Sequence, residues 1–120
     1  MPRATYSRPQ VASIGRTQAE CDRDGIPVKV GKMPFQAVGK AIVNGETEGF
    51  VKVIAHADTD ELLGVHMVGS HVTELIAEAS AAMLFEATSW DVGSAVHPHP
   101  TLSEALGEAA LGVHGKSINF

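Results

Sequence analysis

In the first half of the chain, apolar and polar residues follow the two-residue period of β-strands. The clearest case is a pair of apolar runs, 50–55 and 62–68, which the polar stretch "HADTDE" separates. Two strand-like runs joined by a short polar turn are typical of an antiparallel hairpin, so we expect one here. Further strands are predicted around "ATYSRPQVASIG" and in "IPVKVGKMPF", where Val28 and Val30 would share a face and Lys29 would point away.

The second half of the chain follows the longer period of α-helices. "SWDVGSAV" predicts a short helix or turn with Ser89 as a candidate cap, and "TLSEALGEAALG" predicts a final helix. "HVTELIAEASAAMLFEAT" predicts an amphipathic helix that Thr73 would cap. Its apolar stripe consists of Val72, Leu75, Ile76, Ala79, Ala82 and Met83.

One short helix is expected among the early strands. In "RTQAECDRDG", Thr17 and Glu20 have the spacing of a capping box, and Gly25 would end the helix. Residues 36–43, "QAVGKAIV", fit neither period, and their structure is left open. Because strands come first and helices last, the pattern favours an α+β fold, an antiparallel sheet packed with helices in a single domain.

Composition narrows the classes of function. The chain has 120 residues, 44% hydrophobic and 19% charged, which is typical of one globular domain. Fourteen acidic and nine basic residues give a net charge of −5 without a block of either sign, which argues against nucleic acid or an anionic membrane as the main partner. The single cysteine, Cys21, excludes an internal disulfide and suits the cytoplasm.

The stretch with the most chemical content is "HPHPTLSEAL", residues 97–106. Each proline restricts the residue before it to extended backbone, so His97 and His99 are held outside helical geometry and would share a face. Thr101 is a good N-cap, and Glu104 lies three residues later. A carboxylate in that first turn would lie near His99, select one tautomer of the imidazole and favour its cation. The spacing therefore suggests an acid/base pair.

Two other interpretations of this stretch remain open. The Thr-x-x-Glu spacing is common at helix starts, and Glu104 could serve as a cap alone. His97 and His99 also have the spacing of zinc or copper ligands, with Glu104 or His114 as a third, although two histidines are an incomplete set.

Other residues are expected to be structural. Cys21 is expected to be a buried small hydrophobic residue, while Trp90 and Phe85 would belong to the core or to an interface. Three further histidines lie in or near the hairpin and are expected to be structural or surface residues: His56, His66 and His71.

"HPHPTLSEAL" resembles the signature that ends the pyridine nucleotide-disulfide oxidoreductases, a flavoenzyme family that includes dihydrolipoyl dehydrogenase and glutathione reductase. "PRATYSRPQVASIG", "GFVKVIA", "LLGVHMVG" and "TELIAEA" occur in the order expected of that family's C-terminal dimerisation domain. The resemblance covers essentially residues 1–120, and the opening block and the Leu-Ser after Pro-Thr are most similar to the dihydrolipoyl dehydrogenase branch.

The resemblance assigns roles by position. It implies that His99, directly before Pro-Thr, is the catalytic acid/base and that Glu104 orients it, while Pro100 and Thr101 set the backbone. In such enzymes a dithiol attacks a redox-active disulfide beside the flavin, and electrons pass through FAD to NAD. That centre belongs to the partner subunit, so the domain would form a homodimer and lend each active site a His–Glu pair.

The rest of the family's machinery is expected elsewhere. The chain has no Gly-x-Gly-x-x-Gly and no pair of closely spaced cysteines. FAD and NAD are therefore expected in the full-length parent and not in this segment, which would be inactive alone as an expressed piece or proteolytic product. The FAD and NAD domains of the parent would be its neighbours, and a 2-oxo acid dehydrogenase complex is a further candidate partner.

Two alternatives to this assignment stay open. The first is the same domain from a glutathione reductase-like enzyme that reduces another disulfide. The second is a free-standing dimerisation or metal-binding module in which His97 and His99 are ligands.

Overall fold

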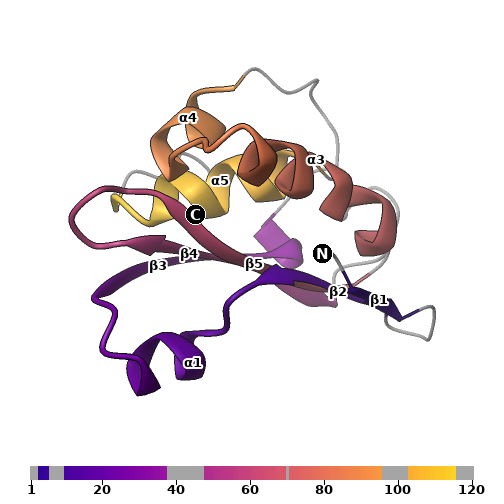
Figure 1. The fold of residues 1–120 in the computed structure, drawn as a ribbon. Coiled ribbons are helices and arrows are strands. Elements are labelled where there is room, and N and C mark those ends of the chain that lie inside the picture. The colour runs from indigo at the N-terminus through magenta and orange to yellow at the C-terminus, as the bar shows by residue number, and fades with distance from the viewer. Residues whose placement is uncertain (1–2, 6–9, 38–47, 70, 96–102, 116–120) are drawn as a thin grey trace.

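The described part of the chain forms one sheet with helices on both faces. A computed structural model describes residues 3–5, 10–37, 48–69, 71–95 and 103–115 (Figure 1). The strands are β1 (Arg3–Thr5), β2 (Gln10–Gly15), β3 (Val28–Pro34), β4 (Gly49–His56) and β5 (Leu62–Gly69). The helices are α1 (Gln18–Arg23), the 3-10 turn η1 (Phe35–Ala37), α3 (Val72–Leu84), α4 (Ser89–Ser94) and α5 (Glu104–Gly112). This α+β architecture confirms the predicted fold class.

The sheet is antiparallel throughout, with the strand order β1-β2-β5-β4-β3. The predicted hairpin is its centre: β4 pairs with β5, and Val51 lies opposite Met67. A shift of register between Ile54 and Ala55 interrupts this pairing near the turn. On the far side of β5, β2 pairs through its full length, which brings Ile14 opposite Val65.

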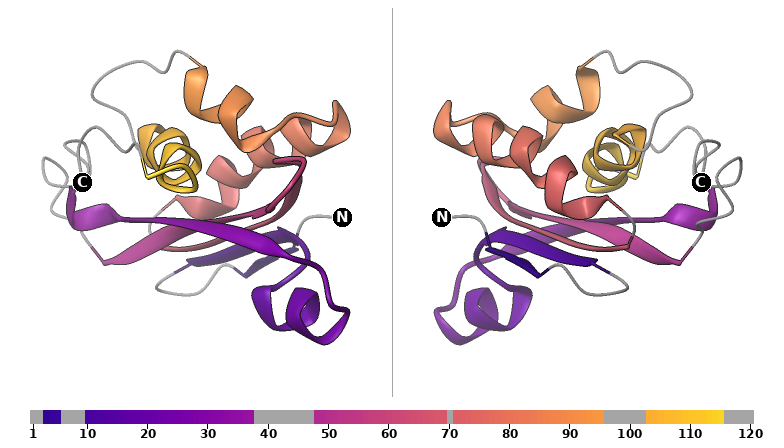
Figure 2. Two further views of the ribbon diagram at one scale, coloured as in Figure 1. Left: turned by 90° about the vertical axis from the view of Figure 1, so that its left-hand side faces the viewer. Right: turned by 90° about the vertical axis from the view of Figure 1, so that its right-hand side faces the viewer.

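The hydrophobic core lies between the sheet and the helices α3, α4 and α5, which all cover one face (Figure 2). Alternate residues of β4 and β5 supply its floor, and Val51, Val53, Val65 and Met67 are fully buried. The predicted stripe of α3 covers this floor: Val72, Ile76 and Ala79 are buried, and Leu75, Ala82 and Met83 pack against the core. The apolar stripe predicted from the sequence is therefore confirmed.

Helix α5 lies so close to β3 that the backbones touch. A Cβ added at Gly31 would come within 1.9 Å of the Ala109 carbonyl oxygen and 2.5 Å of the Val113 nitrogen. Since any side chain would occupy that space, glycine at this position of β3 sets the depth at which α5 sits on the sheet. Helix α4 also packs closely on α5, where Gly93 lies against the side chain of Leu111.

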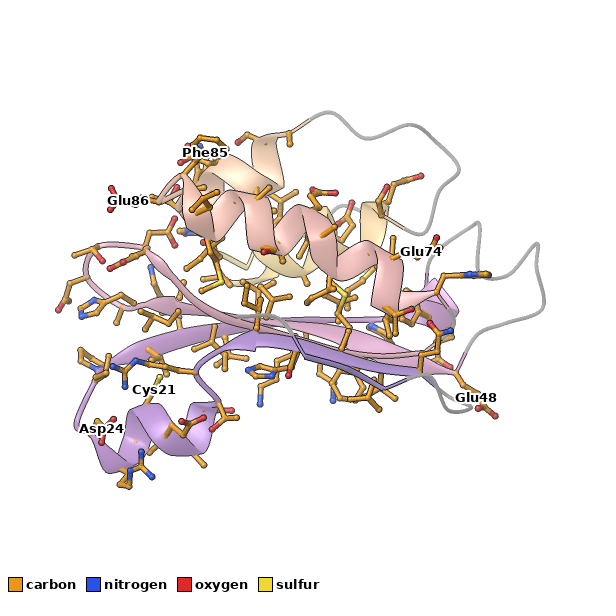
Figure 3. All side chains as sticks on the ribbon, turned by 45° about the vertical axis from the view of Figure 1, so that its right-hand side comes forward. Cys21, Asp24, Glu48, Glu74, Phe85 and Glu86 are labelled. Carbon is orange, nitrogen blue, oxygen red and sulfur yellow. The ribbon has the colours of Figure 1, made fainter. Side chains whose placement is uncertain are left out.

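Helix α1 covers part of the opposite face (Figure 1). Its predicted capping box is present, since the Glu20 N–H donates to Thr17 Oγ1 and the Thr17 N–H donates to Glu20 Oε1, each at 3.1 Å. Cys21 is fully buried, as predicted, and its side chain lies between α1 and the sheet (Figure 3). Ile54 is also fully buried, and it alternates with Val53 along β4 and so points to the α1 side.

Two predicted helix caps, Thr73 and Ser89, are wrong because their hydroxyls form hydrogen bonds to residues distant in the sequence. Helix α3 begins after His71, which has a left-handed φ of 63° and makes no side-chain cap bond. Thr73, the predicted cap, instead donates its hydroxyl to Gln10 Oε1 at 2.8 Å. Helix α4 is capped by Thr88, in a capping box with Asp91, while Ser89 is buried.

Two aromatic side chains lie outside the core. Phe85, at the end of α3, is 82% exposed (Figure 3), and Trp90 is 48% exposed. The expectation that they pack in the core is therefore wrong, and the interface alternative remains a prediction. Among the described residues, no helix has the length and apolar character needed to cross a bilayer.

We expect Gly31→Ala to lower the free energy of unfolding by about 3 kcal/mol, the upper part of the usual range for overpacked sites, because backbone atoms of α5 must move. Gly93→Ala is the matched control. Its new methyl comes within 3.0 Å only of Leu111 side-chain atoms and stays 3.2 Å from the Leu111 backbone nitrogen, and alanine is favoured over glycine in a helix by about 1 kcal/mol. Urea unfolding measures the loss of unfolding free energy in each variant. An equal loss in Gly31→Ala and Gly93→Ala would contradict the prediction.

Candidate functional site

The predicted acid/base pair is split between described and undescribed parts of the chain. His97, His99, Pro100 and Thr101 fall in 96–102, outside the described residues. Glu104 is the first residue of α5, and Ser103 precedes it as the N-cap without a side-chain cap bond. Within the described residues Glu104 is therefore first in the helix and not third, as the predicted Thr101 cap would require.

The two helices that flank this segment are described in full. Helix α4 ends at Ser94, and α5 begins at Glu104. From Ala105 to Ala110, every residue of α5 is buried. The half-buried Glu104 is therefore the first residue of a helix whose next six residues are all buried in the domain.

The described residues also contain a polar cluster that the sequence patterns did not indicate. Asp60, which follows the turn between β4 and β5, accepts a hydrogen bond from the buried Ser89 hydroxyl and another from the Trp90 N–H at 2.9 Å. Its Oδ1 also lies 3.1 Å from Nε2 of His114, and Ser89 Oγ lies 3.0 Å from the same nitrogen. The Trp90 ring stands edge-on to the His114 imidazole, with 5.4 Å between centroids.

The cluster holds Asp60 in its ionised form. Burial raises the pKa of this carboxyl, but the hydrogen bonds from Ser89, Trp90 and His114, with the charge of His114, together lower the pKa below its ordinary value of 3.8. Asp60 also has a left-handed φ of 64°, a conformation that few residues other than glycine adopt. The side-chain contacts therefore stabilise an unfavourable backbone conformation.

Serine, histidine and aspartate meet here, but the arrangement is not that of a nucleophilic triad. In a triad the imidazole bridges the other two groups through its two different nitrogens. Here Ser89 and Asp60 both approach Nε2 of His114, and Ser89 donates to the carboxylate. Ser89 is also fully buried, so no substrate can reach its hydroxyl. The cluster binds three segments together and performs no chemistry itself.

His114 was a candidate third metal ligand, and the structure gives it these other contacts. In the described parts of the chain, no three His, Cys, Asp or Glu side chains are grouped as a metal site would require. Two of the three histidines near the hairpin, His56 and His66, have structural contacts, as expected. His66 Nε2 donates to the Arg16 carbonyl at 2.8 Å, and His56 Nδ1 accepts from the Asp58 N–H at 3.1 Å.

The fold and the position of Glu104 define a class of protein: an α+β domain with an antiparallel sheet, in which a largely buried helix begins at the half-buried Glu104. Residues 1–110 match the family described as the pyridine nucleotide-disulphide oxidoreductase, dimerisation domain. The chain belongs to this family.

Two relatives in sequence are dihydrolipoyl dehydrogenases. The chain is 56% identical over 120 residues to dihydrolipoyl dehydrogenase of Bacillus subtilis and 49% identical to dihydrolipoyl dehydrogenase 3 of Pseudomonas putida. These matches cover the whole chain but only 25% and 26% of the relatives, so the chain spans about a quarter of their length.

Solved structures show the same fold. LpdA from Mycobacterium tuberculosis superimposes with a TM-score of 0.86 at 23% identity, over 92% of this chain and 24% of that one. The HOCl-induced flavoprotein disulfide reductase RclA from Escherichia coli gives a TM-score of 0.87 at 22% identity, over 92% of this chain and 26% of its own.

We expect Asp60→Asn to lower the free energy of unfolding at pH 7 by about 1–3 kcal/mol, because charge-assisted hydrogen bonds to buried partners are weakened. The pKa of Asp60 is depressed in the folded state, so its stabilisation is complete above the unfolded pKa of about 4 and is lost as the pH falls through the folded value. The gap between parent and variant should therefore narrow below about pH 4.

Urea titrations between pH 7 and pH 3 measure this gap. Asp58→Asn is the control, since Asp58 lies in the same turn, is exposed and takes no part in the cluster. A gap that is constant with pH, or that the control reproduces, would contradict the role of the Asp60 charge.

Proposed function

We propose that this chain is the dimerisation domain of a dihydrolipoyl dehydrogenase, which oxidises dihydrolipoamide with NAD by way of FAD. The observation that carries the proposal is the 56% identity to the Bacillus subtilis enzyme over all 120 residues. Such an enzyme would work in the cytoplasm, where Cys21 stays reduced, and would serve a 2-oxo acid dehydrogenase complex.

The described residues do not fit a dinucleotide. A pyrophosphate is usually held where a parallel strand turns through glycines into a helix, and the sheet described here is antiparallel throughout. FAD and NAD would therefore be bound by other parts of the enzyme. The contribution of this chain is restricted to joining subunits and to handling a proton.

The proton chemistry would be carried by His99. A thiol becomes a good nucleophile only as the thiolate, so a base near the dithiol substrate accelerates its attack on a disulfide. His99 would accept that proton, and Glu104 would stabilise the resulting imidazolium and fix the tautomer of the neutral ring. The position of Glu104 at the start of α5, directly after the segment that carries His99, supports this assignment.

The disulfide would belong to the partner subunit, so the pair acts across the dimer interface. An acid/base must be held within hydrogen-bond reach of its proton, which requires a rigid support. The prolines around His99 restrict its backbone, and the buried helix α5 anchors Glu104. Formation of the dimer and completion of the active site would then be the same event.

His99→Gln should lower kcat for dihydrolipoamide oxidation by about 10²–10⁴, the usual effect of losing a general base. The assay uses a flavoenzyme in which residues 1–120 replace the matching quarter of the Bacillus subtilis relative. Glu104→Gln should lower kcat by a smaller factor, because it removes only the carboxylate partner of the base. Flavin absorbance must stay normal in both variants.

His97→Gln is the matched control, because it changes the neighbouring histidine of the same segment. A His99→Gln enzyme with full flavin and a rate within about threefold of the parent would reject the base, since that ratio corresponds to under ~1 kcal/mol of barrier.

The 120-residue chain should form a homodimer by itself, with a mass near twice 12.6 kDa. Size-exclusion chromatography with light scattering and visible absorbance tests this. We expect a colourless dimer. A monomer at all accessible concentrations would show that this chain alone does not supply the interface. A yellow peak would show that this chain binds flavin, which would contradict the proposal that FAD is bound by other parts of the enzyme.

A further inference from the structure

One carboxylate contacts both helices that flank the His97–Thr101 segment. Asp60 binds the first turn of α4, where it accepts from the Ser89 hydroxyl and from the Trp90 N–H at 2.9 Å. It also binds the residues that follow α5, where His114 Nε2 lies 3.1 Å from its Oδ1. Along the chain α4 precedes this segment and α5 follows it, so Asp60 joins the start of α4 to the residues after α5, and we call Asp60 and these two helices the frame.

The α5 side of this frame is held at two points. Gly31 of β3 allows the backbone around Ala109 to contact the sheet, and His114 anchors the end of the helix to Asp60. Glu104 and Gly112, the two ends of α5, are ~12 Å apart at 1.5 Å per residue. Loss of the His114 anchor would let α5 tilt about its contact with Gly31, and Glu104 at the opposite end of the helix would then move.

The α4 side is held in the same way. Besides the two bonds from Ser89 and Trp90 to the carboxylate, the Ser89 N–H donates to the Asp60 carbonyl at 3.0 Å. Gly93, one turn later, lies directly against the Leu111 side chain of α5. The two helices therefore cannot move apart at this end without breaking bonds to Asp60.

The cluster is also built at a cost to the backbone. Asp60 keeps a φ of 64°, and its carboxylate is only 17% exposed. A left-handed residue is common in hairpin turns, but a carboxylate that is so little exposed needs hydrogen-bond partners, and Asp60 has them on α4 and after α5. Strained, buried polar residues of this kind commonly support functional sites.

We infer that Asp60 is a positioning residue for the His99–Glu104 pair, acting through Ser89 on α4 and His114 after α5. The inference rests on the proposed function, since it takes His99 as the base and Glu104 as its partner. It adds three residues to the apparatus of the reaction, none of which contacts substrate.

The test follows the His99 imidazole by NMR in the 120-residue chain. Glu104→Gln first defines how far the pH midpoint of the His99 resonance moves when its carboxylate is lost. Asp60→Asn, with Glu104 intact, should then reproduce at least about half of that movement, because Glu104 is displaced from the ring. Asp58→Asn, the control in the same turn, should leave the midpoint unchanged.

Activity provides the second readout, in the flavoenzyme that carries this domain. Asp60→Asn should lower kcat by about 10-fold, within the range for small displacements of a catalytic group. The KM for NAD should stay unchanged, because the frame touches no part of the proposed nucleotide site. Ser89→Ala removes a contact of Asp60 on α4, and His114→Gln removes its contact after α5. Each should lower kcat by less than Asp60→Asn does.

The outcomes separate the two proposals. If Glu104→Gln leaves the His99 midpoint unmoved and His99→Gln leaves the rate unchanged, the proposed function fails. If both have their expected effects while folded Asp60→Asn matches the parent in midpoint and kcat, only the positioning role is overturned. Should Asp60→Asn fail to fold, Ser89→Ala and His114→Gln decide the matter by the same two readouts.

Discussion

The ionised carboxylate of Asp60 joins two helices of the helical layer, α4 and α5, to the central hairpin. Its oxygens accept hydrogen bonds from the start of α4 and lie against His114 after α5, so the carboxylate joins the β4–β5 turn to both helices. A carboxylate suits this place because it accepts several bonds at once, and each bond to a charged acceptor is stronger than one between neutral groups. Those bonds lower the pKa of Asp60 despite its burial, so the charged form is favoured in the folded protein.

The rest of the domain places this carboxylate and the helices around it. The central hairpin carries Asp60 at its turn, and the same two strands supply the floor of the core on which α3 lies. Gly31 lets α5 approach the sheet until the backbones touch. Stability and proposed chemistry therefore use the same contacts, because the helix that closes the core also carries Glu104.

This arrangement suits a domain whose proposed work lies in another subunit. A side chain presented across an interface gains its rate enhancement from position, and position requires a support that does not relax when the partner arrives. The chain supplies such support from local restriction by prolines and from burial of α5. Family membership, the matching fold and identity to dihydrolipoyl dehydrogenases are consistent with that division of labour.

Local patterns in the sequence were enough to identify the main elements. The alternation in β4 and β5 predicted their hairpin, the stripe of α3 predicted its buried face, and the Thr17–Glu20 spacing predicted the capping box of α1. Each of these signals depends on residues within a turn or two of one another. The acid/base pair predicted from the motif "HPHPTLSEAL" stays a prediction, because the described residues include only Glu104 of the pair.

Where several segments compete for one side chain, the sequence did not determine the outcome. Ser89 was predicted as a helix cap, but its hydroxyl donates to Asp60, which is 29 residues away along the chain. Thr73 was also predicted as a cap, but its hydroxyl donates to Gln10, which is 63 residues away. His114 was a candidate metal ligand, but its Nε2 lies 3.1 Å from Oδ1 of the same Asp60. The sequence by itself determined the strands, the helices and the family, because those depend on period and motif. Only the tertiary structure decided which polar groups meet, because hydrogen bonds between distant segments depend on how the sheet and helices pack.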